Sequence, residues 1–144
     1  MKKILVGLDG SPRAAGVLAA AIRLARATSA RVQLFRAVGV PPDVPEIAWS
    51  IAPAQLEVVL QREALEALEA LARDLPVQLV AGESVALGVP WQGICQAARR
   101  ENADLIVIGS HGYGGADRLL GTTAAKVVNH ADRSVLVVRT PERL

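Results

Sequence analysis

The chain contains one cysteine, Cys95, which excludes a framework of disulfides within the chain. Cys95 lies in an apolar pattern with helical spacing, so we expect a buried structural thiol. Aromatic residues are also scarce: they make up 3% of the chain, whereas hydrophobic residues of all kinds make up 51%. The core must therefore be built from Val, Leu, Ile and Ala. A length of 144 residues is typical of one domain, and we expect residues 1–144 to form one.

An excess of charge of one sign is also lacking, since 16 basic residues stand against 14 acidic ones and the net charge is +2. No block of Lys or Arg suggests a groove for nucleic acid. The pair Arg99-Arg100 is more typical of the C-terminal end of a helix, where the helix dipole favours positive charge. We therefore expect no nucleic-acid partner.

Long apolar runs are missing as well. No run approaches the roughly 18 residues that a membrane-spanning helix needs. The first residues, MKKILVGLDG, contain too short an apolar region for a signal peptide and no small-residue cleavage site. These features favour a soluble, cytoplasmic protein without a membrane partner.

What the chain does contain is a regular alternation of aliphatic runs and amphipathic segments. Strands are predicted at residues 3–9, 31–38, 77–81, 104–108 and 134–139. Helices are predicted at residues 12–28 with Ser11 as N-cap, 54–75 and 122–130, and residues 88–100 are predicted to form a loop and then a helix with Pro90 near its start. The proline-rich residues 39–53 are predicted to form a long loop. Such alternation is typical of a single α/β domain with a mostly parallel sheet and helices on both faces.

Asp9 is a candidate site residue because it follows the first predicted strand. In an open parallel sheet, ligands bind at the carboxyl ends of the strands, where the strand order reverses. Asp9 could cap the turn into the first helix, as Asp often does. Alternatively, its carboxylate faces a ribose hydroxyl, an adenine amino group or a bound metal. Because Ser11 can serve as the helix cap, Asp9 is available for such a contact.

A glycine-rich stretch, GSHGYGGADRLLGTT at residues 109–123, joins the fourth predicted strand to the last helix. Glycine weakens regular structure, so it needs a local reason. One reason is an anion site, in which backbone N–H groups, a helix N-terminus and the hydroxyls of Thr122 or Thr123 face phosphate oxygens. The other is a tight loop without a ligand. The stretch is not a Walker A loop, because no Gly-Lys-Ser/Thr ends it, and the dinucleotide fingerprint belongs to the first strand–helix turn instead.

Over nearly its whole length the sequence resembles the universal stress protein family. The similarity begins at KILVGLDGS, includes GVPWQGI and is strongest from DLIVIGSHG through LLGTTAAKVVNHADRSVLVVR. The resemblance implies an open, Rossmann-like, five-stranded parallel sheet with strand order 3-2-1-4-5. That order makes strands 1 and 4 neighbours, so Asp9 and the glycine-rich stretch would line one crevice.

ATP-binding members of that family carry Gly, two residues, Gly, nine residues, then Gly and Ser or Thr. Here Gly109, Gly112 and the pair Gly121-Thr122 match this pattern, although residues 113–120 make the second spacing one residue short. Two further glycines within that spacing could absorb the difference.

The resemblance implies a bound ATP, with Mg²⁺ held through its phosphates and Asp9 as a candidate ligand of the metal. His111 is interpreted as a solvated loop residue, and a contact with the ligand is the alternative. The nucleotide-binding residues implied are Asp9, Ala37, Ile108, Gly109, Gly112, Gly121, Thr122 and Thr123.

Three functions remain open at this point. The first is an ATP-binding stress-response protein that acts as a nucleotide-dependent switch. The second is a nucleotide-independent homodimeric interaction protein. The third is an enzyme, for which the sequence offers no Walker lysine, no general base beside the phosphates and no convincing metal cluster. We therefore expect slow ATP hydrolysis at most.

Residues 134–139, SVLVVR, come last in the strand order that the resemblance implies, so they would form an edge of the sheet. An exposed apolar edge strand risks aggregation unless it is covered or paired. The resemblance implies antiparallel pairing of two copies about a two-fold axis. The alternative is that the proline-rich loop or the tail PERL covers the edge within one chain.

Overall fold

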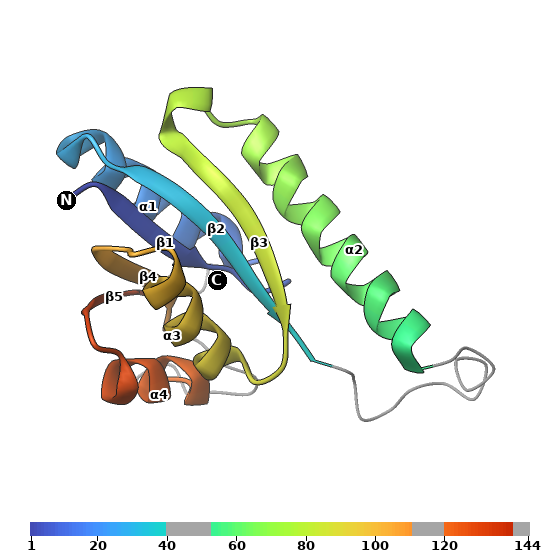
Figure 1. Cartoon of the computed structure of the whole chain (residues 1–144). Coiled ribbons are helices and arrows are strands. Elements are labelled where there is room, and N and C mark those ends of the chain that lie inside the picture. Colours follow the sequence, from blue (N-terminus) through green and yellow to red (C-terminus); the bar gives the residue numbers. More distant parts are fainter. Residues whose placement is uncertain (40–52, 111–119, 140–144) are drawn as a thin grey trace, which may run out of the picture.

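The computed structural model of the protein describes residues 1–39, 53–110 and 120–139. They form one parallel sheet with helices on both faces (Figure 1). The strands are β1 (Lys3–Gly7), β2 (Arg31–Val38), β3 (Val80–Leu87), β4 (Leu105–Gly109) and β5 (Ser134–Val138). The helices are α1 (Ala14–Thr28), α2 (Pro53–Arg73), α3 (Pro90–Arg100), α4 (Thr122–His130) and a short 3₁₀ helix, η2 (Val77–Leu79).

The sheet has the strand order β3-β2-β1-β4-β5, and every neighbouring pair is parallel. The predicted fold class and strand order are therefore confirmed. The central strand β1 buries Ile4, Leu5 and Val6 completely. A continuous apolar run of this kind is typical of a parallel strand that is covered on both faces.

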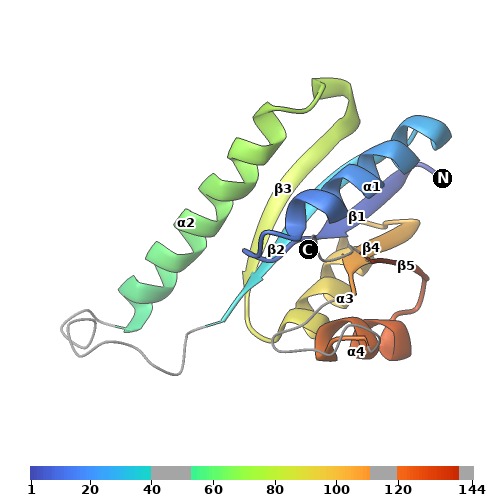
Figure 2. The same cartoon turned by 180° about the vertical axis from the view of Figure 1, so that it is seen from behind.

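Two hydrophobic cores lie on opposite faces of the sheet. Ile4 and Val6 of β1 join the core under α1 and α2, whereas Leu5 joins the core under α3 and α4, because successive side chains of a strand point to opposite faces. Figure 2 shows the face that carries α1. Apart from Phe35 and Cys95, the buried members of both cores are Val, Leu, Ile and Ala, as the composition predicts.

Strand β3 differs from the prediction. A strand was predicted at residues 77–81, but residues 77–79 form η2 and the strand runs from Val80 to Leu87. Two features conceal β3 in the sequence. It lies at an edge of the sheet and is half-buried over most of its length, and its residues 82–84 (Gly-Glu-Ser) lack the β-branched character typical of strands.

A buried amide explains why small and polar residues suit this part of β3. Gln33 of β2 is 5% exposed, and its Nε2 donates a hydrogen bond to Ser84 Oγ at 3.5 Å. A Cβ atom at Gly82 would lie 3.0 Å from Gln33 Oε1, so a larger residue would push on the amide. The β2–β3 register shifts between Val32 and Gln33, as at a β-bulge. These contacts join residues far apart in sequence, so local pattern does not report them.

The first helix also starts later than predicted. The prediction makes Ser11 the N-cap and Pro12 the first helical residue, whereas α1 begins at Ala14 after a turn. The turn is closed by a hydrogen bond from Ala14 N to the Ser11 carbonyl oxygen at 3.2 Å. Arg13 takes the N-cap position and makes no side-chain capping bond.

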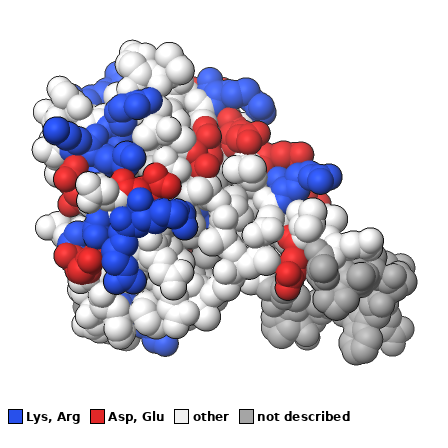
Figure 3. Space-filling view, viewed as in Figure 1, with Lys and Arg blue, Asp and Glu red and all other residues white. Residues whose placement is uncertain are grey.

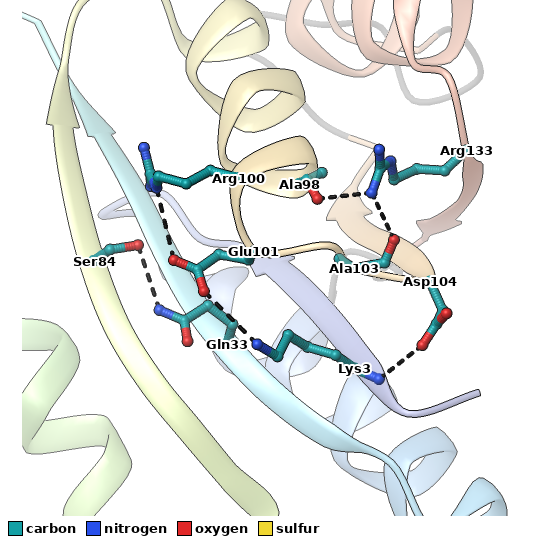
Figure 4. A network of polar contacts seen from close by, with 9 residues as sticks. All are labelled: Lys3, Gln33, Ser84, Ala98, Arg100, Glu101, Ala103, Asp104 and Arg133. Atoms are coloured by element: carbon teal, nitrogen blue, oxygen red, sulfur yellow. Dashed lines mark hydrogen bonds and ion pairs between the residues drawn. The ribbon is translucent and has the colours of Figure 1, made fainter.

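Side chains that bond backbone groups hold the amino ends of the strands (Figure 4). Asp104, directly before β4, accepts hydrogen bonds from Lys2 N at 2.7 Å and Lys3 N at 2.9 Å. Arg133, directly before β5, donates from Nη1 to two backbone carbonyl groups at 2.7 and 2.8 Å. Charged side chains therefore link the amino ends of the strands, at the end of the sheet opposite the predicted crevice.

The surface carries both signs of charge. On the face in Figure 3, basic and acidic side chains are interspersed, in keeping with the nearly balanced composition. Of the helices that the structure describes, none combines the length and the apolar character that crossing a membrane requires.

Candidate functional site

The carboxyl ends of β1 and β4 lie side by side, as the crevice hypothesis requires. The two strands pair directly, with Val6 opposite Val107. The chain continues from β1 towards Asp9 and from β4 into Ser110, so both segments leave the sheet at the same edge. Gly121 lies beside the segment after β4, because its N–H donates a hydrogen bond to the Ser110 carbonyl oxygen at 2.8 Å. The start of α4 is thereby attached to the end of β4.

The structure describes all but one of the predicted nucleotide-binding residues. Gly112 and the neighbouring His111 lie outside the described residues. Ile108 and Gly109 end β4, and residues 121–123 span the N-cap and first positions of α4. Ala37 is half-buried near the carboxyl end of β2, the strand on the other side of β1. These positions lie around the carboxyl ends of the central strands.

Asp9 takes part in the turn that follows β1. Its Oδ1 accepts a hydrogen bond from Ser11 N at 3.0 Å, and Ser11 Oγ accepts one from Arg13 N at 3.3 Å. Ser11 was predicted to be the helix N-cap, which would leave Asp9 available for a ligand, but the N-cap position is taken by Arg13. Asp9 bonds within the turn, which was the alternative prediction for it. The Asp9 carboxylate remains exposed beside the strand ends, and a second oxygen on it can face a ligand.

Arg36 is a residue of this edge that the sequence reasoning missed. A Cβ atom at Gly10 would lie 2.8 Å from Arg36 Nη2, so the guanidinium of β2 reaches across to the turn after Asp9. It brings a positive charge to the edge of the sheet where an anionic ligand is predicted. Its place in the alternating strand RVQLFRAV, one residue before Ala37, is the signal that could have revealed it.

Glycines at the strand ends have packing reasons of their own. A Cβ atom at Gly7 would lie 3.0 Å from Ile108 Cγ2, and one at Gly109 would lie 3.1 Å from Val17 Cγ2. Both glycines therefore let α1 or a neighbouring strand approach closely. For Gly109, the ligand interpretation and the packing interpretation are compatible, because both need backbone without a side chain.

The N-terminus of α4 has the features of an anion site. Gly121 occupies the N-cap position with extended backbone and offers no side-chain capping bond, and no acidic residue lies in the first turn. The first N–H groups of a helix have no intrahelical acceptors, and the helix dipole adds partial positive charge there. Thr122 is exposed and Thr123 half-buried at this end, so both hydroxyls stand near those N–H groups.

The described ranges contain no group of three His, Cys, Asp or Glu side chains that could hold a metal ion. A metal ion at this edge would therefore depend on ligand oxygens in addition to a carboxylate such as Asp9.

A separate shallow hollow of about 400 Å³ lies between α3 and α4, and it contains none of the predicted site residues. Trp91 and His130 stack in it, with ring centroids 4.5 Å apart, and Lys126 Nζ lies 5.8 Å from the Trp91 ring centroid. Cys95 borders the same hollow and is buried, as predicted. Burial, opposed by Arg99, raises the pKa of its thiol, which favours the protonated, unreactive form.

An open parallel sheet with the order β3-β2-β1-β4-β5 and helices on both faces defines the class of Rossmann-like α/β domains. Within that class the chain belongs to the universal stress protein family, whose model matches residues 1–139. The resemblance seen in the sequence is therefore confirmed.

A curated relative and a solved structure each match the chain over nearly its whole length. A universal stress protein of Methanocaldococcus jannaschii is 34% identical over 99% of this chain and 84% of its own length. The solved structure of universal stress protein UspA from Lactobacillus plantarum has a TM-score of 0.74 at 25% identity, and the match covers 96% of this chain and 97% of that one.

Two other solved structures contain adenine nucleotides. One is a universal stress protein in complex with cAMP, with a TM-score of 0.60 at 24% identity over 97% of this chain and 98% of that one. The other is the universal stress protein from Archaeoglobus fulgidus in complex with dAMP, with a TM-score of 0.63 at 21% identity over 95% and 97%. Both share the fold of this chain.

Proposed function

We propose that this protein binds ATP, with Mg²⁺ held through the phosphates, and acts in the cytoplasm as a nucleotide-dependent switch or interaction module of the stress response. The observation that carries the proposal is the attachment of the α4 N-terminus to the end of β4 through the 2.8 Å bond between Gly121 and Ser110. It brings N–H groups that have no acceptor within the helix to the carboxyl ends of the strands, where Asp9 is exposed.

The charges at this edge also favour an anion. No acidic residue lies in the first turn of α4, and Arg36 reaches the turn after β1. The glycine pattern of the family's ATP-binding members supports phosphates as the anion, in spite of the spacing that is one residue short. That proteins with this fold hold cAMP and dAMP supports an adenine nucleotide as the ligand class.

Efficient catalysis is not part of the proposal. Among the described residues from Leu120 to Ala125 at the α4 N-terminus, the side chains are threonine and aliphatic groups, none of which is a general base. Asp9 follows β1, the neighbour of β4, and its exposed carboxylate could assist a metal bound to the phosphates. We therefore expect ATP hydrolysis, where it occurs, to be slow.

A substitution at the exposed Thr122 can distinguish an anion site from a tight loop that binds no ligand. We expect Thr122→Asp to weaken ATP binding by at least about tenfold, because a carboxylate at the helix N-terminus repels phosphate and competes for the same N–H groups. The same carboxylate should leave the melting temperature unchanged or raise it, since it complements the helix dipole. Calorimetric titration with ATP and Mg²⁺, together with thermal melts, measures both effects.

Thr122→Asn is the matched control, because it has the size of aspartate without the charge. It should bind ATP within a few-fold of the wild type. Equal ATP affinity of the wild type and the folded Thr122→Asp protein would contradict an anion site at this helix. So would a wild type that binds no ATP.

The alternative function is a homodimeric interaction protein that needs no nucleotide. It is favoured by β5, which lies at the edge of the sheet with Leu136 39% exposed and both neighbouring valines half-buried. Nucleotide released from the purified, denatured protein distinguishes the two functions. Its presence supports the ATP-binding switch, and its absence from protein that also fails to bind added ATP supports the alternative.

A further inference from the structure

The hollow between α3 and α4 has no part in the proposed function. Both helices cover the same face of the sheet (Figure 1), and the hollow between them has a volume of about 400 Å³. Sites for small molecules typically have volumes of this order. The residues that line the hollow are Trp91, Gln92, Cys95, Gln96, Arg99 and His130. None of them is a predicted nucleotide-binding residue, so the hollow is a separate candidate site.

Helix α3 presents two neighbouring rows of side chains to this hollow. Trp91 and Cys95 are four residues apart and form an apolar row, in which Cys95 is 5% exposed. Gln92, Gln96 and Arg99 follow one another at steps of four and three residues and form a polar row beside it. All three polar residues are exposed. The hollow therefore has an apolar side and a side that offers hydrogen-bond donors.

Helix α4 adds an imidazole ring and a second positive charge. His130 Nδ1 lies 2.8 Å from the Lys126 carbonyl oxygen, and because a carbonyl oxygen only accepts, Nδ1 donates this hydrogen bond. The bond and the stacking on Trp91 together hold the ring in place. Lys126 Nζ lies 5.8 Å from the centroid of the Trp91 ring, so its charge is also close to the hollow.

The charge of Arg99 is not neutralised by an ion pair with any residue that the structure describes. Its neighbour Arg100 pairs with Glu101 at 3.7 Å, and Asp132, after α4, accepts two hydrogen bonds from Arg133. Both carboxylates therefore already have a cationic partner, and none of the described residues that line the hollow is acidic. A cation at the end of α3 also suits the helix dipole, but Arg100 fulfils that role as well.

We propose that this hollow binds a small organic anion, a molecule that carries one charged group on a flat apolar body. The guanidinium of Arg99 holds the anionic group, because its N–H donors match the paired oxygens of a carboxylate or a similar anion. The amides of Gln92 and Gln96 donate to the same group. The apolar body lies against Trp91 and Cys95. The inference is independent of the proposed ATP-binding function, since the two sites share no residue.

Two dyes provide matched probes for the test. Anilinonaphthalene sulfonate joins one anionic group to flat apolar rings and fluoresces on apolar surfaces, and N-phenylnaphthylamine has similar rings without the charge. Titration of the wild type with the sulfonate dye should give saturable fluorescence. Arg99→Gln should raise the Kd of that dye about tenfold, as expected for loss of a hydrogen bond to a charged group. The Kd of the uncharged dye should be unchanged by the same substitution.

Arg100→Gln is the matched control. It removes the same charge from the next residue of α3, which does not line the hollow. Its Kd for the sulfonate dye should stay within error of the wild type. Thermal melts of both variants show whether they are folded.

Cys95 gives a second readout at the hollow itself, because it borders the hollow and is the single cysteine of the chain. Bound sulfonate dye should slow the alkylation of this thiol by iodoacetamide in the wild type and in Arg100→Gln. At the same dye concentration it should protect the thiol less in Arg99→Gln, where less dye is bound. An excess of ATP with Mg²⁺ should change neither the dye fluorescence nor the protection, since the proposed nucleotide site contains none of the residues that line the hollow.

Several results would overturn the inference. Fluorescence that does not saturate, or equal dye affinity of the wild type and folded Arg99→Gln, would mean that the dye binds elsewhere. Equal losses in Arg99→Gln and Arg100→Gln would show a general effect of charge without a site. Alkylation of Cys95 that is equally fast with and without dye would show that the hollow is empty, and displacement of the dye by ATP would mean that it occupies the nucleotide site. A wild type that binds the dye as expected but binds no ATP would contradict the proposed function alone.

Discussion

A single exposed carboxylate can stabilise the start of a sheet, and Asp104 is the example in this protein. The hydrogen bonds from Lys3 N and then Lys2 N lower the pKa of Asp104 below its ordinary value. A lowered pKa in the folded state means that the charged form stabilises the fold. That stabilisation is complete above the unfolded-state pKa of about 3.9 and disappears as the pH falls through the lower folded-state pKa.

Asp104→Asn should therefore lower the melting temperature at neutral pH, because the amide accepts the two N–H bonds without charge. The difference from the wild type should shrink as the pH falls below about 3.9, where the wild-type carboxyl group also becomes protonated. Thermal melts of both proteins over an acidic pH series measure this. A difference that is the same at every pH would show that the charge of Asp104 has no part in stability.

Two substitutions can separate the turn contact of Asp9 from the ligand contact that we propose for it. Asp9→Asn keeps an oxygen that can accept the Ser11 N–H, so the turn should persist, whereas Asp9→Ala removes it. If the carboxylate contacts the nucleotide or its metal, both variants should lose about 1.5–3 kcal/mol of ATP binding, the range for a hydrogen bond involving a charged group. Only Asp9→Ala should also lose stability. Calorimetry and melts on each variant test this, and intact ATP affinity in both would leave Asp9 as a turn residue alone.

At the scale of elements, the sequence predicted those whose signals are local. The bounds of β2 (Arg31–Val38) and α4 (Thr122–His130) agree with the prediction, because flanking turns and apolar spacing mark both ends. The prediction of β3 was wrong because Gly82 and Ser84 are suited to the buried Gln33 of another strand: the glycine leaves room for the amide, and the serine accepts a hydrogen bond from it. The predicted start of α1 was wrong because the residues that looked like a helix cap form the turn of Asp9 and Ser11 instead.

The residues of the candidate site also differ in whether local sequence reveals them. Asp9 and the glycines were predictable because a carboxylate or glycine after a strand is a pattern within a few residues. Arg36 and Ser110 were not, because their importance depends on contacts across the sheet. Arg36 reaches the Gly10 turn from the next strand, and Ser110 bonds to both Val138 and Gly121.

The position of α4 also depends on contacts at its other end. His130, the last residue of α4, stacks on Trp91 in the first turn of α3, and Lys126 approaches the same ring. Val127 is fully buried in the core between them and the sheet. Helix α4 is thus fixed by contacts along its length, and these contacts keep its N-terminus at the end of β4. An anion site requires donors that are fixed in this way.

At the scale of the whole molecule, the register of β5 determines which of its backbone groups face outwards. Val138 accepts the Ser110 N–H and pairs with Gly109, so its N–H and C=O groups point towards β4. Since these groups alternate along a strand, those of Leu136 also point towards β4, and those of Val135 and Val137 point to the outer edge. This edge offers donors and acceptors together with half-buried apolar side chains, and a second copy could pair with it.

We therefore predict a homodimer in which two β5 strands pair antiparallel about a two-fold axis. Val137→Pro should convert it towards monomer, because proline removes an outward N–H while the bonds to β4 remain. Leu136→Pro is the contrasting variant: it removes an N–H that points towards β4, so it should lower the melting temperature substantially as well. Light scattering should give the wild type a mass of about twice 15.1 kDa and Val137→Pro a mass near 15.1 kDa with a melting curve that still shows cooperative unfolding. A wild type that is monomeric at micromolar concentration, or a Val137→Pro protein that remains a dimer, would mean that the β5 edge is not the dimer interface.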